Sequence, residues 1–407
     1  MKTNKIELLA PAGDLSRLKT AVLYGADAVF VGGKKFSLRS RASNFDLDAI
    51  YEGSLFAHQH NSRLHVTVNI IPHEEDFEGL ALYLQQLEAA GVDAIIVASL
   101  SIVKLAKQVA PKLEVHISTQ YSITNSKTID FYRSLGADRC VLARETNLEE
   151  LELLINNTNM PIEVFIHGGM CVNYSGRCTL SNYMTGRDAN RGGCAQSCRW
   201  RYHLYDNGLE VSDPNNLFTM SSKDLNAIEV LPQLIDLGVT SLKIEGRMKT
   251  DYYIANVVGA YRKAIDLIYE GKIERSKIID DTNKLLKNTM SRATFSGFYL
   301  SKPDKNGHLY SVNGSGVLQN FVANILEYDQ SSQMAKIVVK NHFCIDDELE
   351  IMSPDGISNS FKTDLLIDSN NDEVTRLYKP MEICYMKIPF VVKVDDYVRR
   401  VLKHENL

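Results

Sequence analysis

One short phrase occurs four times in this chain and restricts its fold more than any other feature. The copies read GADAVFV from Gly25, GVDAIIV from Gly91, GADRCVL from Gly136 and GVTSLKI from Gly238. Each copy follows an amphipathic stretch, a pattern typical of a helix that ends on a left-handed glycine and turns into a buried parallel strand. The phrase therefore predicts a chain in which helices and parallel strands alternate.

The segments around these phrases supply enough strands for a closed barrel. Apolar runs predict strands at 6–10, 27–32, 64–70, 93–98, 113–118, 139–143, 162–167 and 240–245. Stretches with one apolar stripe predict helices at 14–25, 46–60, 77–90, 100–110, 125–135, 147–157 and 225–237, and a last helix after a cap at Thr250 or Asp251. Eight such units indicate an α/β fold, a TIM-type β/α barrel. A doubly wound open sheet is the alternative, although no GxGxxG follows an early strand.

The pattern changes towards the C-terminus and predicts a second domain. Residues 1–272 would form the barrel and residues 273–303 a helical connector. Residues 304–407 contain short β-rich segments separated by turn residues, which is typical of a small antiparallel β domain. Within the barrel, the seventh βα loop would be a cysteine-rich insertion, 168–224, with a hairpin turn at Asn207 and Gly208. Loops of this length normally carry function.

Four of the seven cysteines lie in that insertion, at Cys171, Cys178, Cys194 and Cys198. The surrounding loop is rich in Gly, Asn, Ser and Arg, so the thiols have little apolar surface to fill and metal binding is favoured. Structural zinc usually takes CxxC knuckles, and none occurs here. The irregular spacing favours a cubane iron–sulfur cluster, with zinc as the fallback metal.

Disulfides are another interpretation of these cysteines, but they need an oxidising compartment. The start, MKTNKIELLAPAG, shows no secretory signal. We therefore expect a cytoplasmic protein. No run of eighteen apolar residues occurs, so no membrane span is expected.

The formal net charge of -5 gives no general basic surface, so contact with nucleic acid would depend on a local patch. The cysteine loop supplies one, with Arg177, Arg187, Arg191, Arg199 and Arg201 against only Asp188 between residues 171 and 201. A guanidinium pairs well with phosphate and with carboxylate. The aromatic residues between these arginines suit packing and base stacking about equally well: Tyr174, Tyr183, Trp200 and Tyr202.

Polar residues also fall at the predicted carboxyl ends of strands, where the chemistry of a TIM barrel gathers. Each alone is more often a structural hydrogen-bonding group, but the set would provide acid, base and anion-binding groups. We expect catalytic roles for His167, Glu145 and Glu245. We expect substrate binding by Asn69, Gln120, Arg144, Arg177, Arg187, Arg199 and Arg247.

The segment SLKIEGRMKT places Lys243, Glu245, Arg247 and Lys249 at alternating positions. In a strand, this alternation would put the four side chains on one face. An internal ion network explains the pattern as well as catalysis does.

Four segments carry a resemblance to a known family: ELLAPAG, EVFIHGGMCVNYSGRCTLSNY, GGCAQSCRWRY and LKIEGRMK. They resemble the collagenase-like peptidase family, peptidase family U32, and are most similar to its bacterial tRNA 5-hydroxyuridine modification proteins. The resemblance implies a 4Fe-4S cluster held by Cys171, Cys178, Cys194 and Cys198. It also implies hydroxylation of wobble uridine in tRNA with prephenate, and a homologous partner subunit.

The residues themselves fit this activity better than proteolysis. No HExxH and no GxSxG elbow occurs, and no lone cysteine has an obvious partner base. The sequence thus favours an RNA base hydroxylase, or an essential component of one. A collagenase-like peptidase, a hydroxylation factor for ribosomal RNA or quinone, and a non-catalytic RNA-binding scaffold are the alternatives.

Overall fold

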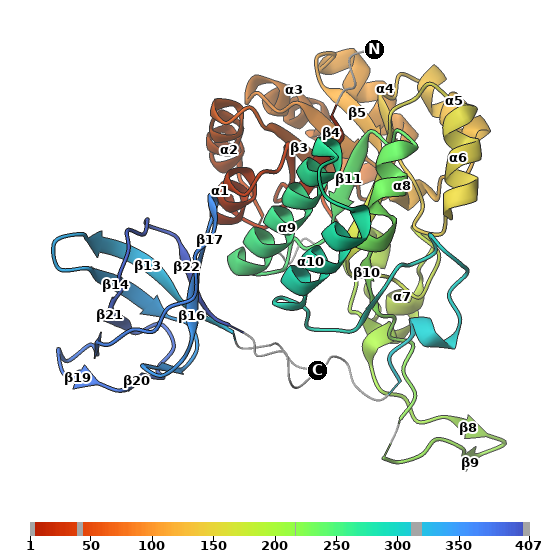
Figure 1. Ribbon diagram of the computed structural model, residues 1–407. Helices are drawn as coiled ribbons and strands as arrows, with labels where there is room; N and C mark the ends of the chain where they lie inside the picture. Colours follow the sequence, from red (N-terminus) through yellow and green to blue (C-terminus); the bar gives the residue numbers. More distant parts are fainter. Residues whose placement is uncertain (1–4, 39–43, 216, 311–319, 402–407) are drawn as a thin grey trace. The chain divides into compact units, whose positions relative to one another are not determined.

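The computed structural model describes residues 5–38, 44–215, 217–310 and 320–401 (Figure 1). These residues form two compact units. The first contains the described residues up to Lys284 and those from Arg292 to 310, and the second contains Leu285–Ser291 and 320–401. No helix in this part of the chain is long and apolar enough to span a membrane.

Parallel strands close the first unit into an eight-stranded barrel. The strands are β1 (Glu7–Pro11), β2 (Ala28–Gly32), β3 (Arg63–Val68), β4 (Ala94–Val97), β5 (Glu114–Ile117), β6 (Arg139–Val141), β7 (Ile162–Gly168) and β11 (Ser241–Ile244). Each strand pairs with the next, and β11 pairs with both β7 and β1, which closes the ring. The TIM-type barrel is confirmed, and every predicted strand overlaps an observed one.

Helices surround this barrel (Figure 1). They are α1 (Leu15–Leu23), α2 (Leu47–Gln59), α3 (Leu80–Ala89), α4 (Leu100–Val109), α5 (Ser126–Ser134), α6 (Leu148–Asn156), α8 (Leu231–Asp236), α9 (Asp251–Glu270) and α10 (Arg275–Lys287). The glycines of the repeated phrase have φ angles of 97°, 77°, 97° and 77°, in chain order. These angles lie in the left-handed region that the phrase predicted. Thr250 is the N-cap of α9, because its hydroxyl accepts a hydrogen bond from Tyr253 N at 3.2 Å.

The predicted helix at 225–237 begins differently. Its first residues belong to β10 (Asp224–Asn226), which pairs antiparallel with the end of β7, and α8 begins only at Leu231. The long insertion returns to the barrel at this point, so its backbone is satisfied by β7 before a helix can start. Strand β12 (Thr294–Phe295), which follows α10, pairs with β10 and ties the end of the first unit to the same place.

The insertion contains the short helix α7 (Leu180–Thr185) and the hairpin β8 (Tyr205–Asp206) and β9 (Leu209–Glu210). The hairpin turns at Asn207 and Gly208, with φ angles of 46° and 83°, as the sequence predicted. In Figure 1 the hairpin extends away from the barrel.

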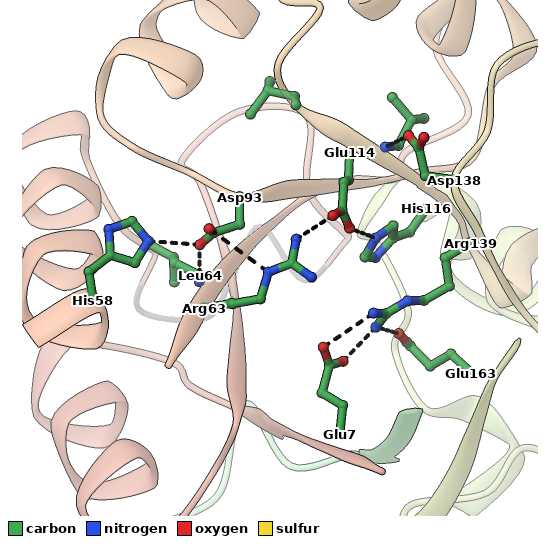
Figure 2. Close-up of polar contacts among 12 residues, drawn as sticks. Glu7, His58, Arg63, Leu64, Asp93, Glu114, His116, Asp138, Arg139 and Glu163 are labelled. Carbon is green, nitrogen blue, oxygen red and sulfur yellow. Dashed lines mark hydrogen bonds and ion pairs between the residues drawn. The ribbon is translucent and has the colours of Figure 1, made fainter. Parts of the chain in front are cut away.

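The amino-terminal ends of the barrel strands hold a network of charges (Figure 2). Arg139 at the start of β6 contacts Glu7 of β1, at 3.2 Å between Nη2 and Oε2, and Glu163 of β7, at 3.2 Å between Nη1 and Oε2. Arg63 of β3 pairs with Glu114 of β5 at 2.7 Å. This end of a TIM barrel usually serves stability.

Lys243 of β11 joins this network, since its Nζ lies 2.7 Å from Glu163 Oε1. The internal ion network is therefore the better interpretation for this residue. The expected shared face does not extend further, because β11 ends at Ile244 and Glu245, Arg247 and Lys249 lie in the following loop.

The second unit is an antiparallel sheet, as expected. Its strands are β13 (Phe321–Asp329), β14 (Met334–Val339), β15 (Phe343–Cys344), β16 (Leu349–Ser353), β17 (Gly356–Ile357), β18 (Leu366–Ile367), β19 (Glu373–Val374), β20 (Arg376–Leu377), β21 (Ile383–Lys387) and β22 (Tyr397–Arg400). The main sheet has the order β17-β16-β22-β13-β14-β21-β18-β19. Ile325, Ile337, Phe343 and Met386 are fully buried in its core.

Candidate functional site

The cysteine loop is fastened to the carboxyl ends of several barrel strands. Glu145, which follows β6, accepts a hydrogen bond from Ser175 N at 2.9 Å. Ser222 Oγ donates to Met170 O at 3.1 Å, close to the end of β7. The loop that carries the cysteines therefore lies at the barrel mouth, where the strand-end residues also gather.

The four loop cysteines are electrostatic neighbours. Cys171 and Cys194 are exposed, whereas Cys178 and Cys198 are half-buried. The pKa of Cys198 is raised to about 11, first by burial and then by Cys171, Cys194 and Cys178, against the opposing charge of Arg199. The loop thus brings the four thiols into one neighbourhood.

Backbone contacts fix this arrangement. Asn190 Nδ2 donates to Cys178 O at 3.1 Å, and Thr219 Oγ1 donates to Cys198 O at 3.3 Å. Within the described ranges, no three His, Cys, Asp or Glu side chains are close enough to hold a single metal ion.

A cavity of about 450 Å³ lies beside the cysteines. Its lining includes Arg187, Cys194, Gln196, Arg199, Trp200 and Arg292. Of the described residues that line it, none is acidic. Arg187 and Arg199 were predicted to bind substrate, whereas Arg292 was missed. Arg292 lies just before β12 in the sequence, and the pairing of β12 with β10 brings this residue to the cavity.

Arg292 is the most buried of the three arginines, with 6% of its surface exposed. Its Nη2 donates to Ser221 Oγ at 2.6 Å and to Ser222 O, and its Nε lies 3.3 Å from Asp224 Oδ1. Burial lowers the pKa of Arg292, and the nearby charge of Arg199 lowers it further. The two guanidiniums are therefore neighbours.

Lys249 connects the cavity with the barrel mouth. Its Nζ lies over the Tyr253 ring, 5.1 Å from the centroid. The pKa of Lys249 is lowered by burial and by Arg199 and Arg292, while Asp224 opposes the shift. Lys249 therefore lies near both the cavity arginines and the carboxylates of Asp224 and Glu245.

His167 lies at the end of β7 and is 4% exposed. Its Nδ1 is 3.4 Å from the Tyr261 hydroxyl. Burial, with a further contribution from Lys249, lowers the pKa of His167 to about 3. The imidazole is therefore neutral near pH 7, and it can accept a proton or a hydrogen bond but does not start as a cation.

Glu145 and Glu245, the other two predicted catalytic residues, both lie near the end of β7 or the cysteine loop. Glu145 Oε2 is buried and has no hydrogen-bond partner in the part of the chain that the structure describes. Glu245 N donates to His167 O at 2.8 Å, so Glu245 directly adjoins the end of β7. Gly168 packs so closely on this residue that a Cβ there would lie 2.2 Å from Glu245 O.

Two predicted substrate-binding residues lie on the β2 and β3 side of the mouth. Arg247 is 4% exposed and donates to Ser37 Oγ at 3.0 Å and to Thr67 Oγ1 at 3.1 Å. Asn69 Oδ1 accepts from Leu38 N at 3.1 Å. Both residues therefore hold the loop that follows β2.

Three more lie on the β5 and β6 side. The Arg144 guanidinium lies 3.8 Å from the centre of the Phe165 ring. Arg177 Nε donates to Ser122 Oγ at 3.1 Å, and a Cβ at Gly176 would lie 2.0 Å from Gln120 O. Arg144, Arg177 and Gln120 thus surround the start of the cysteine loop, apart from the arginine-lined cavity. Their roles in binding stay predictions.

Several curated proteins are similar in sequence to this chain. The chain is 41% identical to tRNA hydroxylation protein P1 of Bacillus subtilis (strain 168), over 98% of this chain and 95% of that protein. It is 41% identical to the 23S rRNA 5-hydroxycytidine C2501 synthase of Escherichia coli (strain K12), over 66% of this chain and 41% of that protein. It is 31% identical to a collagenase of Porphyromonas gingivalis (strain ATCC BAA-308 / W83), over 87% of this chain and 88% of that protein.

Family models cover nearly the whole sequence. Residues 13–309 match the model of peptidase family U32, and residues 318–399 match the C-terminal domain of that family. The chain therefore belongs to peptidase family U32 and contains both the main domain and the C-terminal domain of the family.

Proposed function

We propose that this chain is an iron–sulfur tRNA-modifying protein that hydroxylates wobble uridine to 5-hydroxyuridine, alone or as an essential component of an enzyme. The observation that carries the proposal is a barrel mouth where four neighbouring thiols adjoin an arginine-lined cavity. This mouth belongs to a chain that is 41% identical, over nearly its full length, to a tRNA hydroxylation protein.

The four loop cysteines are the residues that would hold the cluster. They lie near enough for Cys171, Cys178 and Cys194 all to affect the pKa of Cys198, and their irregular sequence spacing without a CxxC pair suits the separated corner irons of a cubane better than zinc. When bound, a 4Fe-4S cluster with a thiolate on every iron supplies electron transfer. Zinc is the fallback metal.

The chain's own residues would bind and orient the RNA. Hydroxylation replaces the C5–H bond of uridine by a C5–OH bond; with water as the source of the oxygen, this releases two protons and two electrons, so the reaction requires a two-electron acceptor. Neutral His167 and the carboxylate of Glu145, whose Oε2 is buried, are groups that can accept a proton at the mouth. Prephenate is the co-substrate that the family resemblance implies.

Nucleoside analysis of tRNA tests this function. A strain without the gene should lack 5-hydroxyuridine in its tRNA, as measured by mass spectrometry, and the wild-type gene should restore it. Cys171→Ser should fail to restore it, because one ligand is lost. Cys344→Ser, in the second unit, is the matched control and should restore it. Unchanged tRNA together with a loss of hydroxylation in ribosomal RNA or quinone would contradict the substrate.

Peptidase activity is the second candidate, because the chain is 31% identical to a collagenase. A cysteine peptidase needs a thiol with a lowered pKa. Burial instead raises the pKa of Cys140 to about 12 and is the main cause that raises that of Cys384 to about 11. Peptide cleavage that is lost in a Cys→Ser variant with unchanged iron content would support this candidate.

A further inference from the structure

The cavity beside the cysteines contains three guanidiniums and one indole, from Arg187, Arg199, Arg292 and Trp200. Its volume of about 450 Å³ falls within the range of ordinary small-ligand sites and can take a group of nucleotide size. The three guanidiniums, with no acidic residue among the described lining, form an environment for an anion, although Asp224 at 3.3 Å partly offsets the charge of Arg292.

The arginines differ in how far the protein already uses them. Arg292 is held by Ser221, Ser222 and Asp224, so its charge is fixed in place. Arg187 Nη2 has one long contact, 3.4 Å to Cys194 O. Its Nε is buried and has no hydrogen-bond partner within the described part of the chain. A buried donor without a partner costs free energy, so the protein's own described groups leave part of this guanidinium unsatisfied.

Arg199 is similarly available. Its Nη1 donates to Gln196 Oε1 at 3.2 Å, and Gln196 itself lines the cavity. A guanidinium has five N–H groups, so this contact leaves donors for a ligand. Two available arginines and a third, fixed one match the several oxygens of a phosphate group better than a single carboxylate, since phosphate offers more acceptors.

We propose that this cavity binds a backbone phosphate of the RNA substrate, with Arg187 and Arg199 as its ligands and Arg292 as a fixed third charge. This inference rests on the proposed function and names the subsite that positions the RNA. Trp200 offers an aromatic face on the same wall, on which a base next to that phosphate can stack.

Trp200 also makes the proposal directly testable, because it is the only tryptophan in the chain. Its emission reports ligands in this cavity, and calorimetry on the anaerobically purified protein gives affinities independently. Inorganic phosphate, uridine, uridine 5′-monophosphate and an anticodon stem–loop RNA are titrated. We expect the monophosphate and phosphate to bind and uridine to bind at least about tenfold more weakly, because it lacks the charge-assisted hydrogen bonds. The RNA should compete with phosphate.

Arg187→Gln should lower the affinity for uridine 5′-monophosphate about tenfold or more. For the RNA, it should also reduce the slope of log affinity against log salt by about 0.7, the change for one lost phosphate contact to a single strand. Arg133→Gln removes the same charge from the exposed face of α5 and is the matched control, with no change in either quantity.

Other outcomes overturn the proposal. Uridine that binds as tightly as its monophosphate would show recognition of the base alone. Prephenate that displaces the monophosphate while RNA does not would assign the cavity to a small carboxylate. An unchanged affinity in Arg187→Gln would place the phosphate elsewhere. Nucleoside analysis keeps the two proposals apart, because hydroxylated tRNA without phosphate binding in this cavity leaves the function intact and rejects only the subsite.

Discussion

Lys243 and Glu163 face each other inside the barrel, with Lys243 Nζ 2.7 Å from Glu163 Oε1 and both side chains almost completely buried. Lys243 Nζ also lies 4.4 Å from the centre of the Phe30 ring. Burial alone would raise the pKa of Glu163, but the charges of Lys243 and Arg139 outweigh it and lower that pKa. The barrel interior therefore depends on paired charges as well as on apolar packing.

Glu163→Gln should lower the free energy of unfolding by about 3 to 5 kcal/mol, because it leaves the buried charges of Lys243 and Arg139 uncompensated. Urea denaturation followed by circular dichroism measures the change. Glu52→Gln is the control, since Lys19 and Glu52 form a 2.9 Å pair whose side chains are 39% and 55% exposed. That variant should cost less than about 1 kcal/mol. Equal losses in the two variants would contradict the role of burial.

The barrel histidines predict how stability changes with pH. His65, His116 and His167 are buried, and burial is the main cause that lowers each pKa from 6.5. Each therefore binds fewer protons in the folded chain than in the unfolded chain. The contribution of these histidines to the free energy of unfolding should be complete above pH 6.5, and the free energy of unfolding should decrease as the pH falls below 6.5. Glu163 adds a further loss below pH 4.5, because its folded pKa is also lowered.

His65→Leu separates this effect from general acid sensitivity. Neither ring nitrogen of His65 has a hydrogen-bond partner among the described residues, so an apolar replacement leaves no described partner unpaired. The variant should reduce the slope of the free energy of unfolding below pH 6.5 by up to about 1.4 kcal/mol per pH unit. His60→Leu, at an exposed position, should leave the slope unchanged. The idea fails if both variants keep the wild-type slope.

The sequence was sufficient for the fold because strand and helix periods are local signals. Each repeated phrase needs a left-handed glycine, and Gly25 and Gly136 have φ angles of 97°. The start of α8 could not be predicted, because β10 forms by pairing with β7 across the whole insertion. Sequence patterns report on neighbours along the chain, whereas that pairing is decided by the closed barrel.

The site was only partly predictable for the same reason. The cysteine spacing pointed to one loop, and the loop does gather the four thiols. Arg292 carried no local signal, since its place in the cavity depends on the pairing of β12 with β10. Arg247 was expected to bind substrate from its position after a strand, but the direction of its side chain depends on Ser37 and Thr67, which lie far away in sequence.

A substitution at Gly168 tests the close approach between Gly168 and the Glu245 backbone at the barrel mouth. It has a φ angle of 104°, and a Cβ there would lie 2.2 Å from Glu245 O. Gly271 has a φ angle of 66°, but a Cβ there would meet no described atom within 4 Å. Gly271→Ala should cost about 1 to 2 kcal/mol of unfolding free energy from the backbone conformation alone. Gly168→Ala should cost about 1 to 3 kcal/mol more, because the backbone of the mouth must also shift.

Gly168→Ala and Gly271→Ala should also differ in the level of tRNA 5-hydroxyuridine that they support. Gly168→Ala displaces the backbone next to His167, so tRNA 5-hydroxyuridine should fall even at a temperature where the variant is folded. Gly271→Ala, at the end of α9, should keep the wild-type level. Mass spectrometry of tRNA nucleosides from complemented strains compares them. A wild-type level in folded Gly168→Ala would show that this contact does not position the site.

The cysteines give the most direct test of the cofactor. Anaerobically purified protein should be brown, absorb broadly in the visible range and contain about four irons per chain. Cys178→Ser should lose most of this iron, because a serine hydroxyl is a poor ligand where a thiolate is required. Cys384→Ser, at a buried position in the second unit, is the control and should keep the iron content even if it lowers stability. A colourless protein with one zinc per chain would reject the cluster, and it would also remove electron transfer from the proposed reaction while leaving the arginine-lined cavity to be tested on its own.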